Sequence, residues 1–214
     1  MHAGRLHYYL AGGTPPGAAR TYAGCRDPHP PEQTEPVMLP GGVYFALESR
    51  AWTGGMAFYD PGLPGFAAAR AYLVTAEQFC DIAAQETYRP IGVDLDLDEV
   101  LATGRQQIGS GRYETLVSAG VLGDYAMLTF TAPWRAGEIA WKAPAPAYLG
   151  MLASGLHESH GWKANRITEY LAALPGVRGI WSLEQVAERV SMVNWRRNGE
   201  RRSQSSNTTR QRRT

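Results

Sequence analysis

The sequence predicts an α+β fold, in which helices pack on a twisted sheet of mostly antiparallel or mixed strands. Strand-like apolar runs are frequent up to residue 132, whereas helical periodicity dominates between residues 146 and 193. The composition of the 214 residues, 44% hydrophobic and 19% charged, is that of a globular domain, and the 24 glycines and 14 prolines indicate many turns. We therefore expect one domain over 1–193 and a disordered, Arg-rich tail over 194–214.

The predicted strands are short apolar runs bounded by turn residues, and the predicted helices repeat apolar residues every three or four positions. Strands are expected at 42–49, 53–60, 70–74, 93–97 and 125–132. Helices are expected at 2–10, 76–87, 146–160 and 164–174, with a last one ending near 193. The segment 93–97 (VDLDL) alternates with a period of two, which favours a strand with one exposed face.

Capping residues mark where two of these helices begin. Thr75 precedes a helical run and Gln78 follows three positions later, the pattern of a capping box in which each side chain bonds the other residue's backbone. Ser182 and Gln185 repeat this pattern before the last helix. The helix that Thr75 begins should end before Pro90, because a proline disfavours helical geometry in the residue that precedes it.

Charge and cysteine usage exclude several classes of protein. The last 20 residues hold seven arginines and one glutamate, a net +6, so the rest of a chain that is +1 overall is net −5. An acidic body with a basic tail is not typical of a nucleic-acid-binding domain. No apolar run reaches the roughly 18 residues of a membrane helix, and the first residues do not have the pattern of a secretory signal. Cys25 and Cys80 form no metal or redox motif, so we expect a cytoplasmic protein that binds neither nucleic acid nor membrane.

One carboxylate lies at an apolar position of a predicted helix. Phe79, Ile82 and Ala83 define the buried stripe of the helix after Thr75, and the next position on that stripe is Glu86. Burial raises the pKa of a carboxyl group, which suits it to proton transfer near neutral pH. The alternatives are that Glu86 lies in a solvated last turn or pairs with Arg89 three positions later.

Several segments resemble the gamma-glutamylcyclotransferase superfamily. Residues 71–86 are similar to its strand-and-helix unit, whose helix ends in a catalytic glutamate at the position of Glu86. Residues 143–148 (APAPAY) resemble its Pro-Ser-Pro-x-Tyr segment, which opens a helix and supplies a substrate-pocket tyrosine, here Tyr148. Residues 53–55 stand where the family has a Gly-rich barrel strand.

This resemblance implies a mixed, barrel-like β-sheet with packed helices, and a cyclotransferase that releases 5-oxoproline from a γ-glutamyl amine or amino acid. The substrate's own amine attacks its γ-carbonyl, so one carboxyl group can take a proton from the amine and give one to the leaving group. In this interpretation Glu86 is the catalytic base and acid, Tyr148 binds the substrate, and Tyr88 is a second substrate-binding candidate. Neither a metal nor a cofactor is expected.

The beginning of the chain departs from the family's pattern. The family opens with a strand and a Tyr-Gly-Ser-Asn loop that holds the substrate, whereas residues 1–6 (MHAGRL) resemble the segment after that loop. We expect that the start of the gene is placed too late, so that Met1 is an internal methionine. The alternative is a chain that has lost the activity.

The sequence is compatible with two further functions. The first is a non-catalytic domain of the same fold that binds a small ligand or a partner. The second is a metal-dependent amidohydrolase or deacetylase, for which the donors would come from His157 and His160 together with three alternating aspartates, Asp94, Asp96 and Asp98. A zinc site normally brings three or four protein ligands together, and HExxH is absent. The metal-dependent enzyme, the third function after the cyclotransferase and the binding domain, therefore has the least support.

Overall fold

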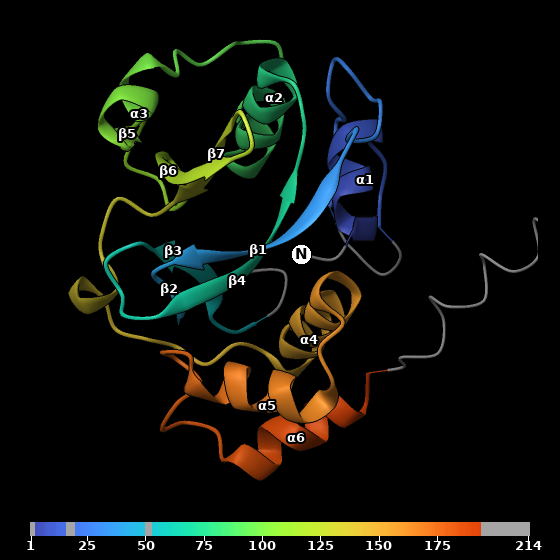
Figure 1. The fold of residues 1–214 in the computed structure, drawn as a ribbon, viewed down its shortest axis with the longest axis vertical. Helices are drawn as coiled ribbons and strands as arrows, with labels where there is room; N and C mark the ends of the chain where they lie inside the picture. The colour runs from blue at the N-terminus through green and yellow to red at the C-terminus, as the bar shows by residue number, and fades with distance from the viewer. Residues whose placement is uncertain (1–2, 16–19, 50–52, 194–214) are drawn as a thin grey trace, which may run out of the picture.

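The computed structural model describes residues 3–15, 20–49 and 53–193, which form the predicted α+β fold (Figure 1). The helices are α1 Ala3–Ala11, α2 Ala76–Glu86, α3 Asp98–Thr103, α4 Pro146–His160, α5 Ala164–Ala173 and α6 Leu183–Ser191, with a 3₁₀ turn at Ala136–Glu138. The strands are β1 Thr34–Pro40, β2 Gly42–Ala46, β3 Met56–Asp60, β4 Phe66–Tyr72, β5 Arg105–Gln107, β6 Thr115–Leu122 and β7 Tyr125–Thr131.

The described strands form three antiparallel sheets, β1-β4, β2-β3 and β5-β6-β7, rather than one mixed sheet. Among them no closed barrel is formed, so the structure confirms the α+β class but not the barrel-like sheet. Loops, not strands, cover the outer edge of β2: the Phe45 amide donates to Pro175 O, and Phe45 O accepts from the Lys142 amide, both at 2.9 Å. These bonds satisfy backbone groups that a further strand would otherwise pair.

The predicted helices and both capping boxes are confirmed, whereas the strand prediction for 93–97 is wrong. In that segment the Leu95 amide donates to Cys80 Sγ at 3.3 Å, and Asp94 pairs with Arg26. The alternating pattern therefore belongs to an extended loop that lies along α2. The sequence analysis also missed β1, β5 and β6; β1 was hidden by its two prolines, which an edge strand tolerates.

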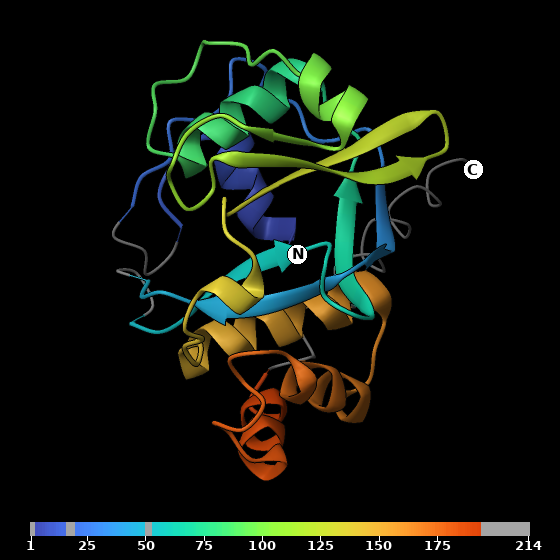
Figure 2. The ribbon, with the colours of Figure 1, turned by 90° about the vertical axis from the view of Figure 1, so that its left-hand side faces the viewer.

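The helices α4, α5 and α6 form a bundle at one end of the molecule, and β5–β7 lie with α2 and α3 at the other end (Figures 1 and 2). The strands β1 and β4 run between the two ends. The bundle encloses a core of fully buried side chains, Phe45, Leu149, Leu156, Ile167, Val186 and Val190. Each such aliphatic side chain contributes about 1.5–3 kcal/mol by leaving water, so this core anchors α4 and hence Tyr148 at its first turn.

Two sequence predictions concern the surroundings of the protein and its tail. Across the described segments, no helix is both long enough and apolar enough to span a membrane. The cytoplasmic location stays a prediction. The Arg-rich tail predicted over 194–214 lies outside the described residues.

Candidate functional site

Glu86 is the last residue of α2, and the chain turns sharply after it. The Thr75–Gln78 capping box starts the helix as predicted: Gln78 N donates to Thr75 Oγ1 and Thr75 N donates to Gln78 Oε1, both at 3.1 Å. At the other end Thr87 donates from both its amide and its hydroxyl to Ala83 O. Tyr88 then takes a left-handed conformation with φ 58°. This turn fixes where the Glu86 carboxyl group can lie.

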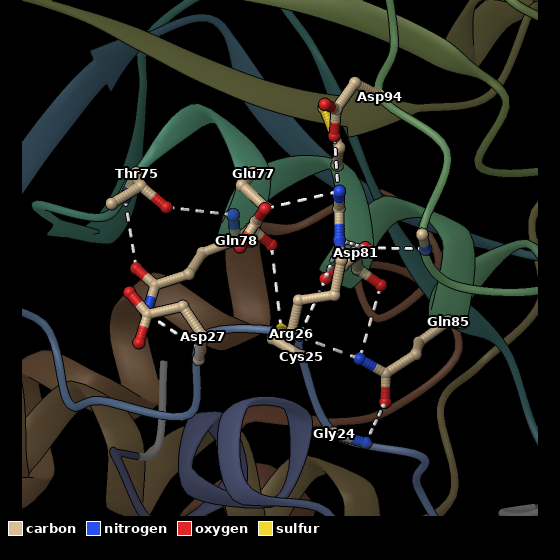
Figure 3. Close-up of polar contacts among 12 residues, drawn as sticks. Gly24, Cys25, Arg26, Asp27, Thr75, Glu77, Gln78, Asp81, Gln85 and Asp94 are labelled. Carbon is tan, nitrogen blue, oxygen red and sulfur yellow. Dashed lines mark hydrogen bonds and ion pairs between the residues drawn. The ribbon is translucent and has the colours of Figure 1, made fainter.

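The face of α2 that carries Gln78, Asp81 and Gln85 is buried, although all three residues are polar (Figure 3). Gln85 accepts from the Gly24 amide at 3.2 Å and donates to Tyr9 O at 3.0 Å. These bonds tie α2 to α1 and to the loop after it. Sequence reasoning missed this face, because polar residues at helical spacing normally indicate solvent exposure.

Arg26 holds the same loop against the middle of α2. Asp81, whose side chain is 0% exposed, accepts from the Arg26 amide at 2.8 Å and from its Nε at 3.0 Å. Arg26 also reaches Glu77 and Asp94 (Figure 3). Burial alone would raise the pKa of Asp81, but these bonds and one from the Gly92 amide outweigh it and lower the pKa. Since the charged groups of Arg26, Asp81, Glu77 and Asp94 already pair with one another, this cluster supports α2 structurally.

The Glu86 carboxyl group lies in a crowded but partly accessible position, where burial raises its pKa. Arg5 on α1 and Arg112, in the turn between β5 and β6, act against that rise. Within the described residues, Glu86 makes no direct ion pair or hydrogen bond, so both guanidinium groups act on it through space. Burial tends to lower the pKa of Arg5, but Glu86, Tyr22 and Tyr148 together outweigh burial and raise that pKa, so Arg5 stays charged.

Two tyrosines complete this group, and both are fixed by β3. The Tyr113 hydroxyl donates to Ala57 O at 3.2 Å, and Tyr148 makes a hydrogen bond with the Ala57 backbone. Burial is the main cause that raises the pKa of both phenols, and the charge of Glu86 adds to it. Both therefore remain neutral hydrogen-bonding groups. We call the set Glu86, Arg5, Arg112, Tyr113 and Tyr148 the Glu86 site.

Aromatic packing orients both tyrosine rings. Tyr148 meets Phe45 of β2 edge to face, with 6.2 Å between ring centroids. Tyr113 packs against Phe58 of β3 at 5.1 Å and Phe130 of β7 at 6.2 Å. The Glu86 site thus draws side chains from α1, α2, α4 and the β5–β6 turn onto a floor made by strands of two sheets.

Two glycines place the start of α4. The Gly55 amide donates to Ala143 O at 2.7 Å. A Cβ atom on Gly54 would lie 2.4 Å from the Ala145 nitrogen, and one on Gly55 would lie 2.0 Å from Lys142 O. Only glycine allows the two backbones to approach this closely. The segment that leads to Tyr148 is therefore set by the turn at residues 53–55.

The structure brings together two of the three site residues predicted from the sequence. The charge of Glu86 contributes to the raised pKa of Tyr148, so the two residues belong to one site. Tyr88 lies elsewhere: its side chain is 76% exposed, and its ring stacks on the Arg20 guanidinium. Arg5, Arg112 and Tyr113 were missed. Arg5 and Arg112 are visible in the sequence as basic residues, but their distance from Glu86 along the chain gives no sign that the three residues share a site.

The candidate metal donors do not meet. His157 Nδ1 bonds to Trp162 O at 2.9 Å and His160 Nε2 bonds to Ala69 O at 3.0 Å. Asp94, in the loop that lies along α2, pairs with Arg26. In the part of the chain that the structure describes, no three His, Cys, Asp or Glu side chains gather closely enough to hold a metal ion.

Chemically, the Glu86 site can bind an anion and exchange a proton. Two guanidinium groups act on one carboxyl group whose pKa is raised by burial, so positive groups outnumber the negative one at this site. The two phenols can donate or accept hydrogen bonds. A protonated Glu86 can in addition donate a hydrogen bond that an ionised carboxylate cannot.

Comparison with known proteins gives one relevant similarity. No family model matches the chain, and no solved structure matches it significantly. The chain is similar to "Histone deacetylase 5" from Arabidopsis thaliana, with 30% identity over 176 residues. The match covers 72% of this chain but 26% of the relative, so the chain spans about a quarter of that protein's length.

This similarity contradicts the activity expected from the sequence. A relative that is named a deacetylase does not support a cyclotransferase that releases 5-oxoproline, and that prediction is wrong on this finding. The name agrees instead with the third function considered, a deacetylase. The match does not test the superfamily resemblance itself, which stays a prediction.

Proposed function

We propose that this chain is a domain that binds a small organic carboxylate at the Glu86 site. The observation that carries the proposal is the charge balance there: the guanidinium groups of Arg5 and Arg112 act on one carboxyl group without pairing with it directly. Among the described residues, neither of these arginines is paired with another carboxylate. Arginine is well suited to bind carboxylates, because its planar donors match their geometry.

The remaining groups of the site define the ligand further. Burial raises the pKa of Glu86, and the protonated form of this carboxyl group donates a hydrogen bond to the ligand instead of repelling it. Tyr113 and Tyr148, both neutral, suit a neighbouring amide or carbonyl group. An N-acylated amino acid carries both features, a carboxylate and an amide within a few bonds of each other.

A panel of small molecules tests this proposal by NMR-detected titration. It contains acetate, N-acetylglycine, a γ-glutamyl amino acid and N-acetylglycinamide, a neutral analogue with the same amide. We expect N-acetylglycine to bind and N-acetylglycinamide to bind about tenfold more weakly or not at all, because a charge-assisted hydrogen bond to arginine is lost. Arg112→Gln should weaken binding by a similar factor.

Arg178→Gln is the matched control, since Arg178 is exposed on the loop between α5 and α6. It should leave the affinity unchanged. Equal binding of the charged and neutral probes, or no binding of any carboxylate at millimolar concentration by the folded protein, would overturn the proposal.

A second candidate function, metal-dependent deacetylation, is favoured by the printed name of the relative. It predicts stoichiometric metal in the purified protein and release of acetate from an acetylated lysine peptide. Elemental analysis and an acetate-release assay, with and without a chelator, decide this directly. A metal-free protein without acetate release after addition of zinc would dismiss the candidate.

We also propose that the three sheets correspond to the barrel-like sheet implied by the superfamily resemblance, in a form where hydrogen-bonded ladders do not close. Contacts between β1 and β6, β2 and β4, and β3 and β7 support this idea. The Thr131 hydroxyl on β7 donates to Tyr59 O on β3 at 2.6 Å, which joins two sheets. An experimental structure in which these strand pairs lie apart would contradict it.

A further inference from the structure

Arg20 lies between two aromatic rings beside the end of α2. Its guanidinium carbon is 4.6 Å from the ring centroid of Tyr22 and 4.4 Å from that of Tyr88. Tyr22 packs in turn on the buried Tyr9, with 4.5 Å between centroids. A guanidinium group over an aromatic face is attracted by the ring's electron density, and more so when two rings share it.

The same guanidinium group is bonded to the last turn of α2. It donates to the carbonyl oxygen of Gln85, the residue before Glu86. Carbonyl groups in the last turn of a helix have no partner within the helix, so an external donor here fixes the turn. Arg20 is absent from the charges that act on Glu86, which are Arg5 and Arg112. Arg20 therefore acts on Glu86 by fixing the position of the last turn of α2, and not through its own charge.

The strained conformation of Tyr88 is consistent with such a role. Its φ of 58° is unfavourable for a residue with a side chain, and its ring is 76% exposed, so burial does not explain its position. The ring stacks on the Arg20 guanidinium group instead. On the other side of Arg20, Tyr22 interacts with Arg5, the cation of the Glu86 site that comes from α1. Arg20 thus connects the two elements that carry Arg5 and Glu86.

We propose that Arg20 is a positioning residue for the Glu86 site: held between Tyr22 and Tyr88 and bonded to Gln85 O, it sets the distance between the end of α2 and α1. The expected effect of Arg20 on ligand binding rests on the proposed function. The expected effect of Arg20 on the position of Glu86 does not. A lysine cannot replace Arg20 here, because an ammonium group lacks the planar face that stacks between two rings.

The test compares Arg20→Lys, which keeps the charge, with Tyr88→Ala, which removes one ring, and with Arg178→Lys as the matched control. The Glu86 carboxyl is followed by ¹³C NMR from pH 4 to pH 8 on the full chain, with the signal assigned through Glu86→Gln. Hydrogen exchange at the amides of Thr87 and Arg89 reports the last turn of α2. Groups facing Glu86 in this titration are Arg5, Arg112, Tyr113 and Tyr148.

In Arg20→Lys and Tyr88→Ala we expect the Glu86 titration to move towards that of ordinary glutamate, because a looser last turn admits water. Exchange at Thr87 and Arg89 should be about tenfold faster, the factor that corresponds to losing one hydrogen bond or stacking contact. Binding of N-acetylglycine should weaken by about the same factor. Arg178→Lys should change none of these.

An unchanged Glu86 titration and unchanged exchange in folded Arg20→Lys would overturn the positioning role, whatever the binding result. If wild type binds no carboxylate but Arg20→Lys shifts the titration, the proposed function fails and the positioning role stands. If wild type binds and Arg20→Lys binds equally well with an unchanged titration, the positioning role alone fails.

Discussion

At the scale of single residues, two carboxyl groups on α2 have opposite environments. Glu86 lies opposite cations that do not touch it, and burial raises its pKa. Asp81, one turn and a half earlier, is bonded to Arg26 and to the Gly92 amide, and its pKa is lowered. The surroundings of Glu86 suit a ligand that carries a negative charge, whereas Asp81 holds a loop against α2.

Replacing Glu86 by glutamine should remove a pH dependence of stability. A folded-state pKa above the unfolded value means that the wild type is most stable at low pH and loses stability as the pH rises through the folded pKa of Glu86. Glu86→Gln should therefore be more stable than the wild type at pH 8, by about 1 kcal/mol, and equal to it at pH 4. Urea unfolding at both pH values measures this. The exposed Glu99→Gln should show no such difference, and a Glu86→Gln protein that is less stable at pH 8 would contradict the account.

Asp81→Asn should have the opposite pH signature. Because the folded-state pKa of Asp81 is lowered, its contribution is present above the unfolded value and is lost as the pH falls through the folded one. At pH 7 the substitution leaves Arg26 without its buried partner, and we expect a loss of about 2 kcal/mol in the free energy of unfolding. Below the folded-state pKa of Asp81 the wild type and the variant should converge. A neutral effect at pH 7 would mean that Arg26 is held by Glu77 and Asp94 instead.

At the scale of elements, the turn at residues 53–55 sets the start of α4. Gly55→Ala should cost about 3 kcal/mol, because its methyl group would meet the Lys142 carbonyl oxygen and one of the two backbones must move. The shift should also displace Tyr148 and weaken ligand binding. Gly137→Ala is the matched control: a Cβ there meets nothing within 4 Å, so its effect should stay within about 0.5 kcal/mol. Thermal unfolding of both variants measures this. Equal transition temperatures for Gly55→Ala and Gly137→Ala would show that the close approach of the two backbones is unimportant.

Elements whose signals are local were predictable from the sequence. The Thr75 and Ser182 capping boxes fixed where α2 and α6 begin, because both partners of each box lie within four residues. The segment 93–97 was mispredicted, since its alternating pattern reflects packing along α2 and not pairing with a strand. Glu86 was found because it interrupts a helical stripe. Arg5 and Arg112 could not be found, because only tertiary packing brings α1 and the β5–β6 turn to the end of α2.

At the scale of the whole molecule, the described fold is held by contacts within residues 3–193. The predicted Arg-rich tail follows the last of these residues. Removing residues 194–214 should therefore leave the thermal transition within about 2 °C of the full chain, because the buried core of the described fold is built from residues up to Val190. Differential scanning calorimetry of the shortened and full chains checks this. A large drop in the transition temperature would show that the tail packs on the domain.

The chain is similar to part of a longer protein named a histone deacetylase. The match covers a quarter of that relative, and the described residues gather no metal-binding cluster. A ligand-binding domain is consistent with both observations. The similarity to a protein named a histone deacetylase does not support the cyclotransferase expected from the sequence.

The most direct test of this account is the affinity for N-acetylglycine as a function of pH, in the wild type and in Glu86→Gln. Between pH 5 and pH 8 the probe's carboxylate is ionised throughout, so any change reports the protein. We expect the wild type to bind more weakly at pH 8 than at pH 5, because the pKa of Glu86 is raised and the ionised form repels the ligand. Glu86→Gln should bind equally at both values. A wild-type affinity that is independent of pH, or one that rises with pH, would contradict the central claim that a protonated Glu86 and two arginines form a carboxylate-binding site.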